Sequence, residues 1–439
     1  MQKVCIDRPL DAGESFFFLA DRVSCMNFVM FAERNGELDP IQIAAGLRRL
    51  QQENRLLEAR ITWTDTGGLR FESAASVPIA LECRATQADG WQASIERELA
   101  RPFDLGDAPL MRCQYLHWSA ADGAPACVLA LTFHHTIADG RSGGELLRRL
   151  LEFLTVNDAL VPRDAAILPP MAESFPETFR WSGQPDAARL ALEQMLTAYG
   201  RHGRVHRLPW LAQPASERHP RFIRLALPPE ATRRLLVLSR QHGTSLHGAL
   251  CAAQLLAQYR VQATGNREAL FLSCPVDMRP YLEPVPPAAP TGLYISLISA
   301  AFAIERGTAF WELAREVILQ TRAQLARGEG HLFFNLYRLT GKPILPAIES
   351  WFAKALLATL DHTAVSNVGR IAAVASDPAV RAISFALCPM PYQALFSCVS
   401  TYEDQLIINM NYDAGKLTTQ VATSLANTVR EVLLKASDG

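Results

Sequence analysis

One stretch of the sequence decides the fold: CVLALTFHHTIADG, which runs from Cys127 to Gly140. Its first half, as far as Phe133, is an apolar run of strand length that is rich in leucine, valine and phenylalanine. Such a run is typical of a strand that is buried on both faces. Two histidines, an aspartate and a glycine follow in its second half. We therefore predict a central strand that ends in a short polar loop.

A helix is expected directly after this loop. Ser142 and Glu145 have the spacing of a capping box, which predicts Ser142 as the N-cap. Leucines then recur at helical spacing and form one apolar stripe, at Leu146, Leu147, Leu150, Leu151 and Leu154. The polar loop thus connects two buried elements, and residues held that rigidly make good catalysts.

Length and composition set the class of protein. At 439 residues the chain exceeds one typical hydrophobic core, so we expect two subdomains. Hydrophobic residues make up 49% and charged residues 20%, which is ordinary for a globular protein. The formal net charge of −1 gives no reason to expect binding to nucleic acid or to a membrane surface.

Cysteine usage and hydropathy indicate the compartment. The nine cysteines form no C-x-x-C pair, and Cys127, Cys251 and Cys274 lie within apolar segments. This pattern is typical of reduced, buried thiols rather than of a disulfide framework. There is no run of about 18 apolar residues and no signal-peptide pattern at the N-terminus. We expect a soluble cytoplasmic protein without a transmembrane segment.

Strands and helices of similar kinds occur in both halves of the chain, which indicates a mixed α/β protein made of two related units. We place an N-terminal subdomain at 1–180, a proline-rich crossover at 181–216 and a C-terminal subdomain at 217–439. Strands are expected at 27–32, 59–63, 69–72, 113–118, 127–133, 221–227, 271–276, 294–304, 382–387, 395–401 and 405–411. Helices are expected at 91–100, 186–199, 246–260, 310–327 and 417–435, with further helices beginning at Pro40, behind an Asp39 N-cap, and at Pro229.

One local basic cluster lies in the crossover, at Arg201, His202, Arg204, His206 and Arg207. A solvated loop is the simpler interpretation. A contact for an anionic donor such as coenzyme A or a carrier protein is the sharper one.

The spacing His134-His135-x-x-x-Asp139-Gly140 resembles the HHxxxDG motif of the acyltransferase superfamily built on the chloramphenicol acetyltransferase fold. Its members include condensation domains of peptide synthetases, plant BAHD acyltransferases, and polyketide-associated and alcohol acyltransferases of bacteria. Weaker likenesses extend over nearly the whole chain, at 102–110, 225–253, 275–279, 366–370 and 401–406. The Asp-Phe-Gly-Trp-Gly element of the plant branch is absent, which favours the bacterial lineages.

The resemblance implies a fold and a set of substrates. Two chloramphenicol acetyltransferase-like subdomains would form a V-shaped pseudo-dimer with a central tunnel that holds the motif. An acyl thioester of coenzyme A or acyl carrier protein would enter from one side, and a small-molecule alcohol or amine acceptor from the other. Carrier and adenylation modules are absent from this chain, so a carrier-bound donor would arrive in trans. We expect no bound cofactor beyond the donor's phosphopantetheine, no nucleic-acid partner, and a monomer.

The resemblance also assigns residues. Acyl transfer requires an acceptor that loses a proton as it attacks, and an imidazole titrates in the right range to take that proton. The motif gives this catalytic role to His135, and the family pattern pairs Asp139 with Arg279. His134 is interpreted as structural, because neighbouring side chains at a strand end point apart. Gly140 permits a backbone conformation or a close approach that a Cβ would block.

Ser366 and Asn367 are candidates for oxyanion or substrate contacts. Residues 140–144 also fit the G-x-S-x-G pattern of serine hydrolases. In those enzymes the serine follows the strand directly, whereas here several loop residues lie between the strand and Ser142. The two adjacent motif histidines point apart and bring no third ligand by spacing. His202 and His206 have helical spacing, but Gly203 between them weakens it, so we predict no metal site.

The favoured function is therefore a stand-alone acyltransferase, ester-forming or amide-forming, in secondary or lipid metabolism. A hydroxyl acceptor comes first and an amine second. The alternatives are an amide-forming free-standing condensation domain, a catalytically silent condensation-like domain that recruits partners, and, less favoured, a serine hydrolase. The intact motif argues against the silent domain.

Overall fold

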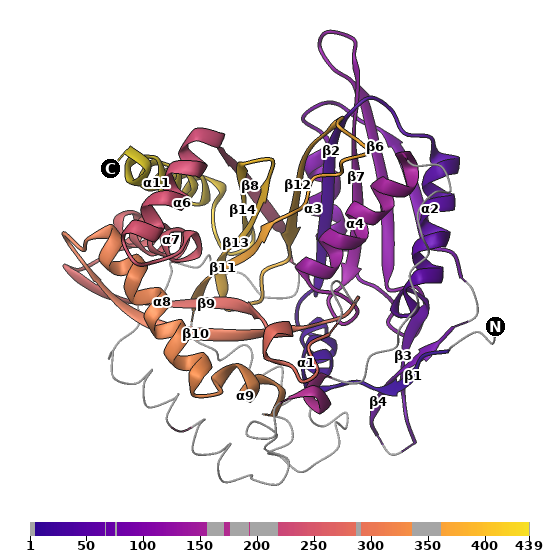
Figure 1. The fold of residues 1–439 in the computed structure, drawn as a ribbon, viewed down its shortest axis with the longest axis horizontal. Helices are drawn as coiled ribbons and strands as arrows, with labels where there is room; N and C mark the ends of the chain where they lie inside the picture. Colours follow the sequence, from indigo (N-terminus) through magenta and orange to yellow (C-terminus); the bar gives the residue numbers. More distant parts are fainter. Residues whose placement is uncertain are drawn as a thin grey trace.

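A computed structural model places the apolar run at the centre of a sheet. It describes residues 5–65, 67–74, 77–155, 171–175, 193, 218–286, 291–335 and 361–438. Within these ranges the chain forms two α/β halves that face each other, with the C-terminal half on the left of Figure 1 and the N-terminal half on the right. The predicted mixed α/β class is confirmed. The expected helix at 186–199, apart from residue 193, and the basic cluster at 201–207 lie outside the described residues.

The N-terminal sheet is built around β7 (Pro125–His134), whose residues are all buried after Pro125. Its strand order is β12 (Val380–Leu387), β2 (Asn27–Asn35), β7, β6 (Met111–Ser119) and β5 (Ala80–Ala85). α2 (Pro40–Glu53) and α4 (Gly140–Thr155) share one apolar cluster with this sheet, and α3 (Trp91–Ala100) shares another. Because Phe28 and Val29 on β2 belong to different clusters, helices cover both faces of the sheet. This explains why β7 reads as an unbroken apolar run.

The C-terminal half is a six-stranded sheet. Its order is β10 (Ile295–Glu305), β9 (Arg267–Asp277), β11 (His362–Arg370), β13 (Gln393–Tyr402), β14 (Gln405–Asp413) and β8 (Pro220–Leu227). One apolar cluster joins it to α6 (Pro229–Gln241), α7 (Leu246–Gln262), α8 (Phe310–Ala326) and α11 (Thr419–Asp438). These helices lie on the side of the sheet that faces away from the N-terminal half (Figure 1). The opposite side is therefore free to form the interface between the halves.

Smaller elements complete the described chain. A three-stranded sheet contains β1 (Asp7–Pro9), β4 (Leu69–Ser73) and β3 (Ala59–Trp63), and the last two, both predicted as strands, pair antiparallel. The remaining α-helices are α1 (Ala12–Asp21) and α9 (Glu329–Asn335). Short 3-10 turns occur at Arg55–Glu58, Met171–Ser174 and Arg279–Tyr281.

One strand crosses between the two halves. β12 belongs to the C-terminal half of the sequence but pairs antiparallel with β2, with Phe385 opposite Met30. The next strand, β13, returns to the C-terminal sheet. The two halves are therefore interlocked by backbone pairing. The predicted subdomain boundaries remain predictions, because almost all of residues 176–217 lie outside the described part.

The starts of two helices test the predicted N-cap residues, one correctly predicted and one not. The Asp39 carboxylate accepts the N–H of Ile41, and Pro40 opens α2, as predicted. The prediction that Ser142 caps the helix after the motif is wrong. α4 begins at Gly140, and the Asp139 carboxylate accepts the N–H of Ser142 at 2.9 Å, so Asp139 is the residue that caps. None of the helices in the described ranges is long and apolar enough to cross a membrane.

Candidate active site

The loop between β7 and α4 is held by a residue from the other half of the chain. Arg279 follows the end of β9, and its Nη2 donates to Asp139 Oδ1 at 3.1 Å, while its Nη1 lies 3.0 Å from Oδ2 in the same ion pair. The Asp139 side chain is fully buried. Two backbone N–H groups complete its shell, from Ser142 and from Tyr294, each at 2.9 Å. Every part of this carboxylate is thus hydrogen-bonded.

The charges of this pair are mutually stabilised. Burial alone would raise the pKa of Asp139, but the Arg279 guanidinium and the N–H donors outweigh it and hold the pKa below its ordinary value. Burial alone would lower the pKa of Arg279, but Asp139 and Asp277 raise it. Asp139 is therefore an ionised positioning group and not a proton donor. The expected ion pair is present, and its functional role stays a prediction.

His135 lies between two aromatic rings at the start of the loop. Its backbone N–H donates to the carbonyl of Met26 at 2.9 Å. Its imidazole stacks on Phe17, with ring centroids 4.2 Å apart and planes at 17°, and Phe28 lies 5.0 Å away at a tilt. Nδ1 is the buried ring nitrogen. These contacts fix the plane of the ring.

This environment keeps the imidazole neutral. Burial lowers the pKa of His135 to about 4, and the Asp139 carboxylate opposes the shift only in part. A neutral imidazole has a nitrogen lone pair that can accept a proton. At neutral pH the ring is therefore in the protonation state that a general base needs.

His134 occupies the opposite side of the strand end. Its Nδ1 lies 2.8 Å from the Thr136 hydroxyl and accepts the Thr136 N–H at 3.3 Å. Its Nε2 lies 3.4 Å from the Asp21 carboxylate, and the side chain is fully buried. His134 is not among the residues that line the cavity described next. The two motif histidines thus point apart and do not converge on one metal ion.

His135 lines a cavity between the two halves of the chain. This cavity encloses about 870 Å³ of empty space, part of it open to solvent. Its walls are mainly apolar, and both halves contribute to them, for example Phe17 and Phe28 from one and Leu297 and Phe396 from the other. The imidazole is therefore not sealed in the interior. A passage that opens on two sides stays a prediction.

The other candidate residues approach the same cavity. Ser366 and Asn367 on β11 line it, and Asn367 Oδ1 accepts the N–H of Gly369 at 2.9 Å. Gly140 also lines it, and a Cβ there would meet Val368 at 2.7 Å. Of the two reasons considered for this glycine, close approach between the halves is the one that the geometry supports.

The Ser142 hydroxyl has a different environment from that of a nucleophile. It donates to the carbonyl of Gly292 at 2.9 Å and accepts from Arg279 at 2.9 Å. A nucleophilic serine needs a base that takes its proton, and here a carbonyl and a guanidinium hold the hydroxyl. Ser142 therefore helps to join the motif loop to the C-terminal half.

A second hollow adjoins the cavity and shares Gly140, Arg141, Arg279 and Val368 with it. It encloses about 700 Å³ of empty space and carries four arginines, at Arg141, Arg148, Arg279 and Arg370. The side chains of Arg141 and Arg370 are 59% and 67% exposed, and each pairs with one carboxylate, of Asp277 and of Asp404. Exposed guanidinium groups at the mouth of an apolar cavity suit a ligand with an anionic end and an apolar end.

Several residues of the site had no signal in the sequence. Phe17 and Phe28 flank His135 from α1 and β2, and Tyr294 and Gly292 bind the motif loop through their backbone. Apolar residues and backbone groups carry no chemical pattern by themselves. Only the chain topology, which brings distant segments to the loop, identifies them.

Comparison with known proteins gives one family match. Residues 216–411 match the family described as phthiocerol/phthiodiolone dimycocerosyl transferase C-terminus. The chain is also similar to the phthiocerol/phthiodiolone dimycocerosyl transferase of Mycobacterium tuberculosis, with 28% identity over 210 residues. That alignment covers 46% of this chain and 48% of the transferase, so the chain matches about half the length of this relative.

Two solved structures show the fold over nearly the whole chain. Polyketide synthase associated protein 5 from Mycobacterium tuberculosis has a TM-score of 0.66 at 18% identity and covers 100% of both chains. The first condensation domain of the CDA synthetase has a TM-score of 0.69 at 18% identity and covers 99% of this chain and 97% of its own. The predicted pair of chloramphenicol acetyltransferase-like subdomains is confirmed as the fold, and the central tunnel stays a prediction.

Asp139→Asn tests the ion pair. The neutral amide leaves the buried guanidinium without its main counter-charge, so we expect unfolding free energy to fall by about 3 kcal/mol or more. Asp404→Asn is the matched control, because it removes an exposed partner of Arg370 and should cost at most about 1 kcal/mol. Urea unfolding followed by circular dichroism measures both. Equal stabilities of the two variants would contradict this role for Asp139.

Proposed function

Because the chain belongs to the superfamily that unites the chloramphenicol acetyltransferase-like acyltransferases with the condensation domains, we propose that it catalyses acyl transfer. The donor is a thioester of coenzyme A or of an acyl carrier protein, and the acceptor is a hydroxyl, with an amine as the second choice. One observation carries the proposal: a neutral imidazole, that of His135, lines an apolar cavity to which both halves contribute.

The reaction needs one residue that moves a proton. The acceptor hydroxyl gives its proton to His135 as its oxygen attacks the thioester carbonyl carbon. The new carbon–oxygen bond forms, the carbon–sulfur bond breaks, and the imidazolium returns the proton to the departing thiolate. A base in this position is worth about 10² to 10⁴-fold in rate. Because Nδ1 is buried, Nε2 is the nitrogen that takes part.

The residues around His135 position the imidazole and the substrate, and they do not take part in proton transfer. Asp139 and Arg279 hold the loop that begins with His135, and both stay charged throughout. As the acceptor attacks, negative charge develops on the carbonyl oxygen of the thioester. Hydrogen-bond donors are needed to stabilise this charge. Asn367 is a candidate, because its Oδ1 is engaged with Gly369 and its amide nitrogen is the group left to donate. Ser366 is the second candidate in the same wall.

The adjoining hollow supports a phosphate-bearing donor. Phosphopantetheine carries a phosphate at one end and the thioester at the other, and both coenzyme A and carrier proteins present it. Arg141 and Arg370 would meet the phosphate, and the apolar cavity would take the acyl chain. With the donor bound, the acyl chain and the apolar walls together would keep water from the thioester and so slow its hydrolysis. Intact-mass detection of transfer from a panel of acyl thioesters to alcohols and amines tests the function directly.

His135→Ala and Ser142→Ala distinguish acyl transfer by the imidazole from a serine hydrolase. We expect His135→Ala to lower kcat by about 10² to 10⁴-fold while the fold is kept, because a proton acceptor is lost. Ser142→Ala removes only hydrogen bonds, so kcat should stay within about tenfold while unfolding free energy falls by about 1 to 3 kcal/mol. Steady-state kinetics and thermal unfolding measure both. Full activity of the His135→Ala variant would refute the proposal. Loss of activity in a correctly folded Ser142→Ala variant would refute it as well.

The pH profile tests the state of the imidazole. Since the pKa of His135 is lowered to about 4, the base should stay unprotonated as the pH falls from 8 to about 5. kcat/KM for an uncharged alcohol should then decline only as the pH approaches 4, with circular dichroism as the control for folding. The same shift makes the folded state lose stability as the pH falls below the unfolded histidine value of about 6.5. A decline in kcat/KM that already begins near pH 6.5 would contradict this prediction.

Arg370→Gln tests the donor site. We expect KM for an acyl-coenzyme A to rise by about tenfold, equivalent to about 1.4 kcal/mol, because a charged contact to phosphate is lost. KM for the matching acyl-pantetheine, which lacks the phosphate, should not change. Arg233→Gln is the control, since Arg233 is 59% exposed and lies on α6, away from the hollow. An equal effect on both donors would exclude a phosphate contact at Arg370.

A further inference from the structure

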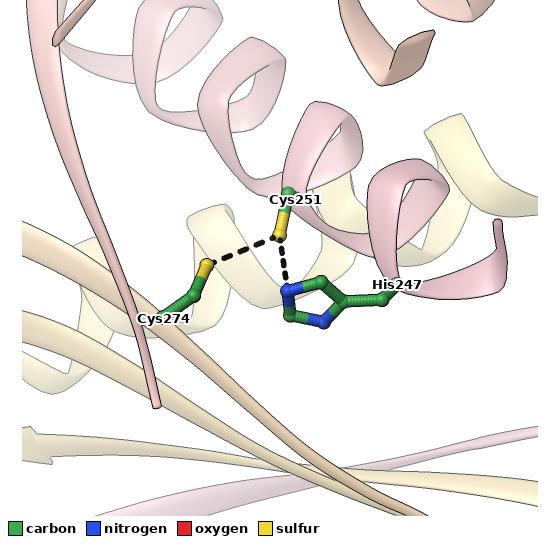
Figure 2. Close-up of side chains that lie close together, drawn as sticks. All are labelled: His247, Cys251 and Cys274. Atoms are coloured by element: carbon green, nitrogen blue, oxygen red, sulfur yellow. Dashed lines mark hydrogen bonds between the residues drawn. The ribbon is translucent and has the colours of Figure 1, made fainter. Parts of the chain in front are cut away.

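A second cluster of reactive side chains lies in the C-terminal half, away from the motif. His247 and Cys251 are four residues apart on α7 and therefore lie on one face of that helix, and Cys274 projects from β9 toward them (Figure 2). Cys251 Sγ lies 3.7 Å from Cys274 Sγ and 3.6 Å from His247 Nε2. All three ligand atoms lie within 4.8 Å of one another.

We propose that His247, Cys251 and Cys274 bind a divalent zinc-class ion. The separations suit one ion placed between the three donors. Zinc–sulfur bonds of about 2.3 Å and zinc–nitrogen bonds of about 2.0 Å, at tetrahedral angles, place two sulfurs about 3.8 Å apart and a sulfur and a nitrogen about 3.5 Å apart. Cys251 Sγ lies 3.7 Å from Cys274 Sγ and 3.6 Å from His247 Nε2, so both distances agree with this geometry. This site does not depend on the acyltransferase proposal.

The charge of the donor set also suits a divalent ion. Two thiolates and one neutral imidazole balance the two positive charges of zinc, so the complete centre is neutral. Neutrality matters here, because Cys251 and Cys274 belong to the apolar cluster between the sheet and its helices.

The location indicates a structural role. Three protein ligands leave a fourth position for water, and His247 is the partly exposed member through which an ion can enter. The ion would fasten α7 to β9. Next to Cys274 on that strand, Pro275 lines the cavity that contains His135, and Asp277 and Arg279 follow. Because neighbouring residues of a strand face opposite ways, the ion would lie behind the cavity wall and out of reach of the substrates.

The sequence carried no signal for this cluster. Cys251 and Cys274 are 23 residues apart, and the set has no C-x-x-C or H-x-x-x-H spacing. Our prediction of no metal site concerned the motif histidines and His202 with His206, and it did not consider these three residues. Only the packing of α7 on β9 brings the third ligand to the other two.

The test measures zinc binding in a chain whose exposed thiols have been removed. Cys5 and Cys83 are the exposed cysteines among the described residues, so Cys5→Ser with Cys83→Ser forms the background. Metal-free protein, kept reduced, is dialysed against zinc and then against buffer, and bound zinc is counted by mass spectrometry. Cobalt, added in place of zinc, reports thiolate ligands through its charge-transfer absorption. Zinc-dependent thermal unfolding is the third measurement.

We expect one zinc per chain in the background, cobalt–thiolate absorption, and a rise in Tm with zinc. Cys251→Ser and His247→Gln should each weaken binding by about 100-fold or more and abolish the rise in Tm. His247→Gln replaces a partly exposed residue, so it keeps the test decisive if the buried serine variant unfolds. Cys113→Ser, another buried cysteine, is the matched control and should bind like the background.

Three results would overturn the proposal. The first is less than a tenth of an equivalent of zinc retained by the background protein. The second is equal zinc affinity in the background and in His247→Gln. The third is a Cys251–Cys274 disulfide in protein purified without reductant, seen as the loss of two hydrogens in the intact mass, because the facing thiols would then form a covalent link and not a metal site.

Discussion

A buried ion pair between Asp139 and Arg279 is the interaction on which the site depends. Two buried charges are costly to remove from water, and they are tolerated only where hydrogen bonds satisfy them. Here Arg279 and two backbone N–H groups surround the Asp139 carboxylate. Since the aspartate lies in the N-terminal half and the arginine in the C-terminal half, the pair fixes the motif loop and joins the halves in one step. β12 adds backbone pairing to the same junction.

The apolar environment of His135 has two consequences that agree with each other. Stacking on Phe17 and burial keep the imidazole neutral, so it can accept a proton. The same apolar side chains, Phe17 and Phe28, line the cavity between the two halves. The charged side chains of the cavity, Arg141, Asp277 and Arg279, lie where it adjoins or shares residues with the arginine-lined hollow. Under the proposed function, the arginine-lined hollow would bind the anionic end of the donor and the apolar cavity would hold its acyl chain.

Much of this could be predicted from the sequence, and the failures have physical reasons. The β7 run, the Asp39 cap and the Asp139–Arg279 pair follow from hydropathy, local hydrogen bonding and a family motif. Ser142 was expected to cap its helix, but the helix begins earlier, at Gly140, so the preceding Asp139 is the cap and its carboxylate accepts the N–H of Ser142. The strand β11 escaped prediction because polar residues interrupt its apolar pattern. The Phe17 stack depends on contacts between distant segments, which no local pattern encodes.

The central claim is that Asp139 and Arg279 act as one unit to present His135 to the cavity. A double-mutant cycle in kcat/KM measures this most directly, with Asp139→Asn, Arg279→Gln and the double variant. The account predicts that the two single losses overlap, with a coupling energy of about 1 to 3 kcal/mol. Losses that add to within about 0.5 kcal/mol would show that the two residues act independently, and would contradict it.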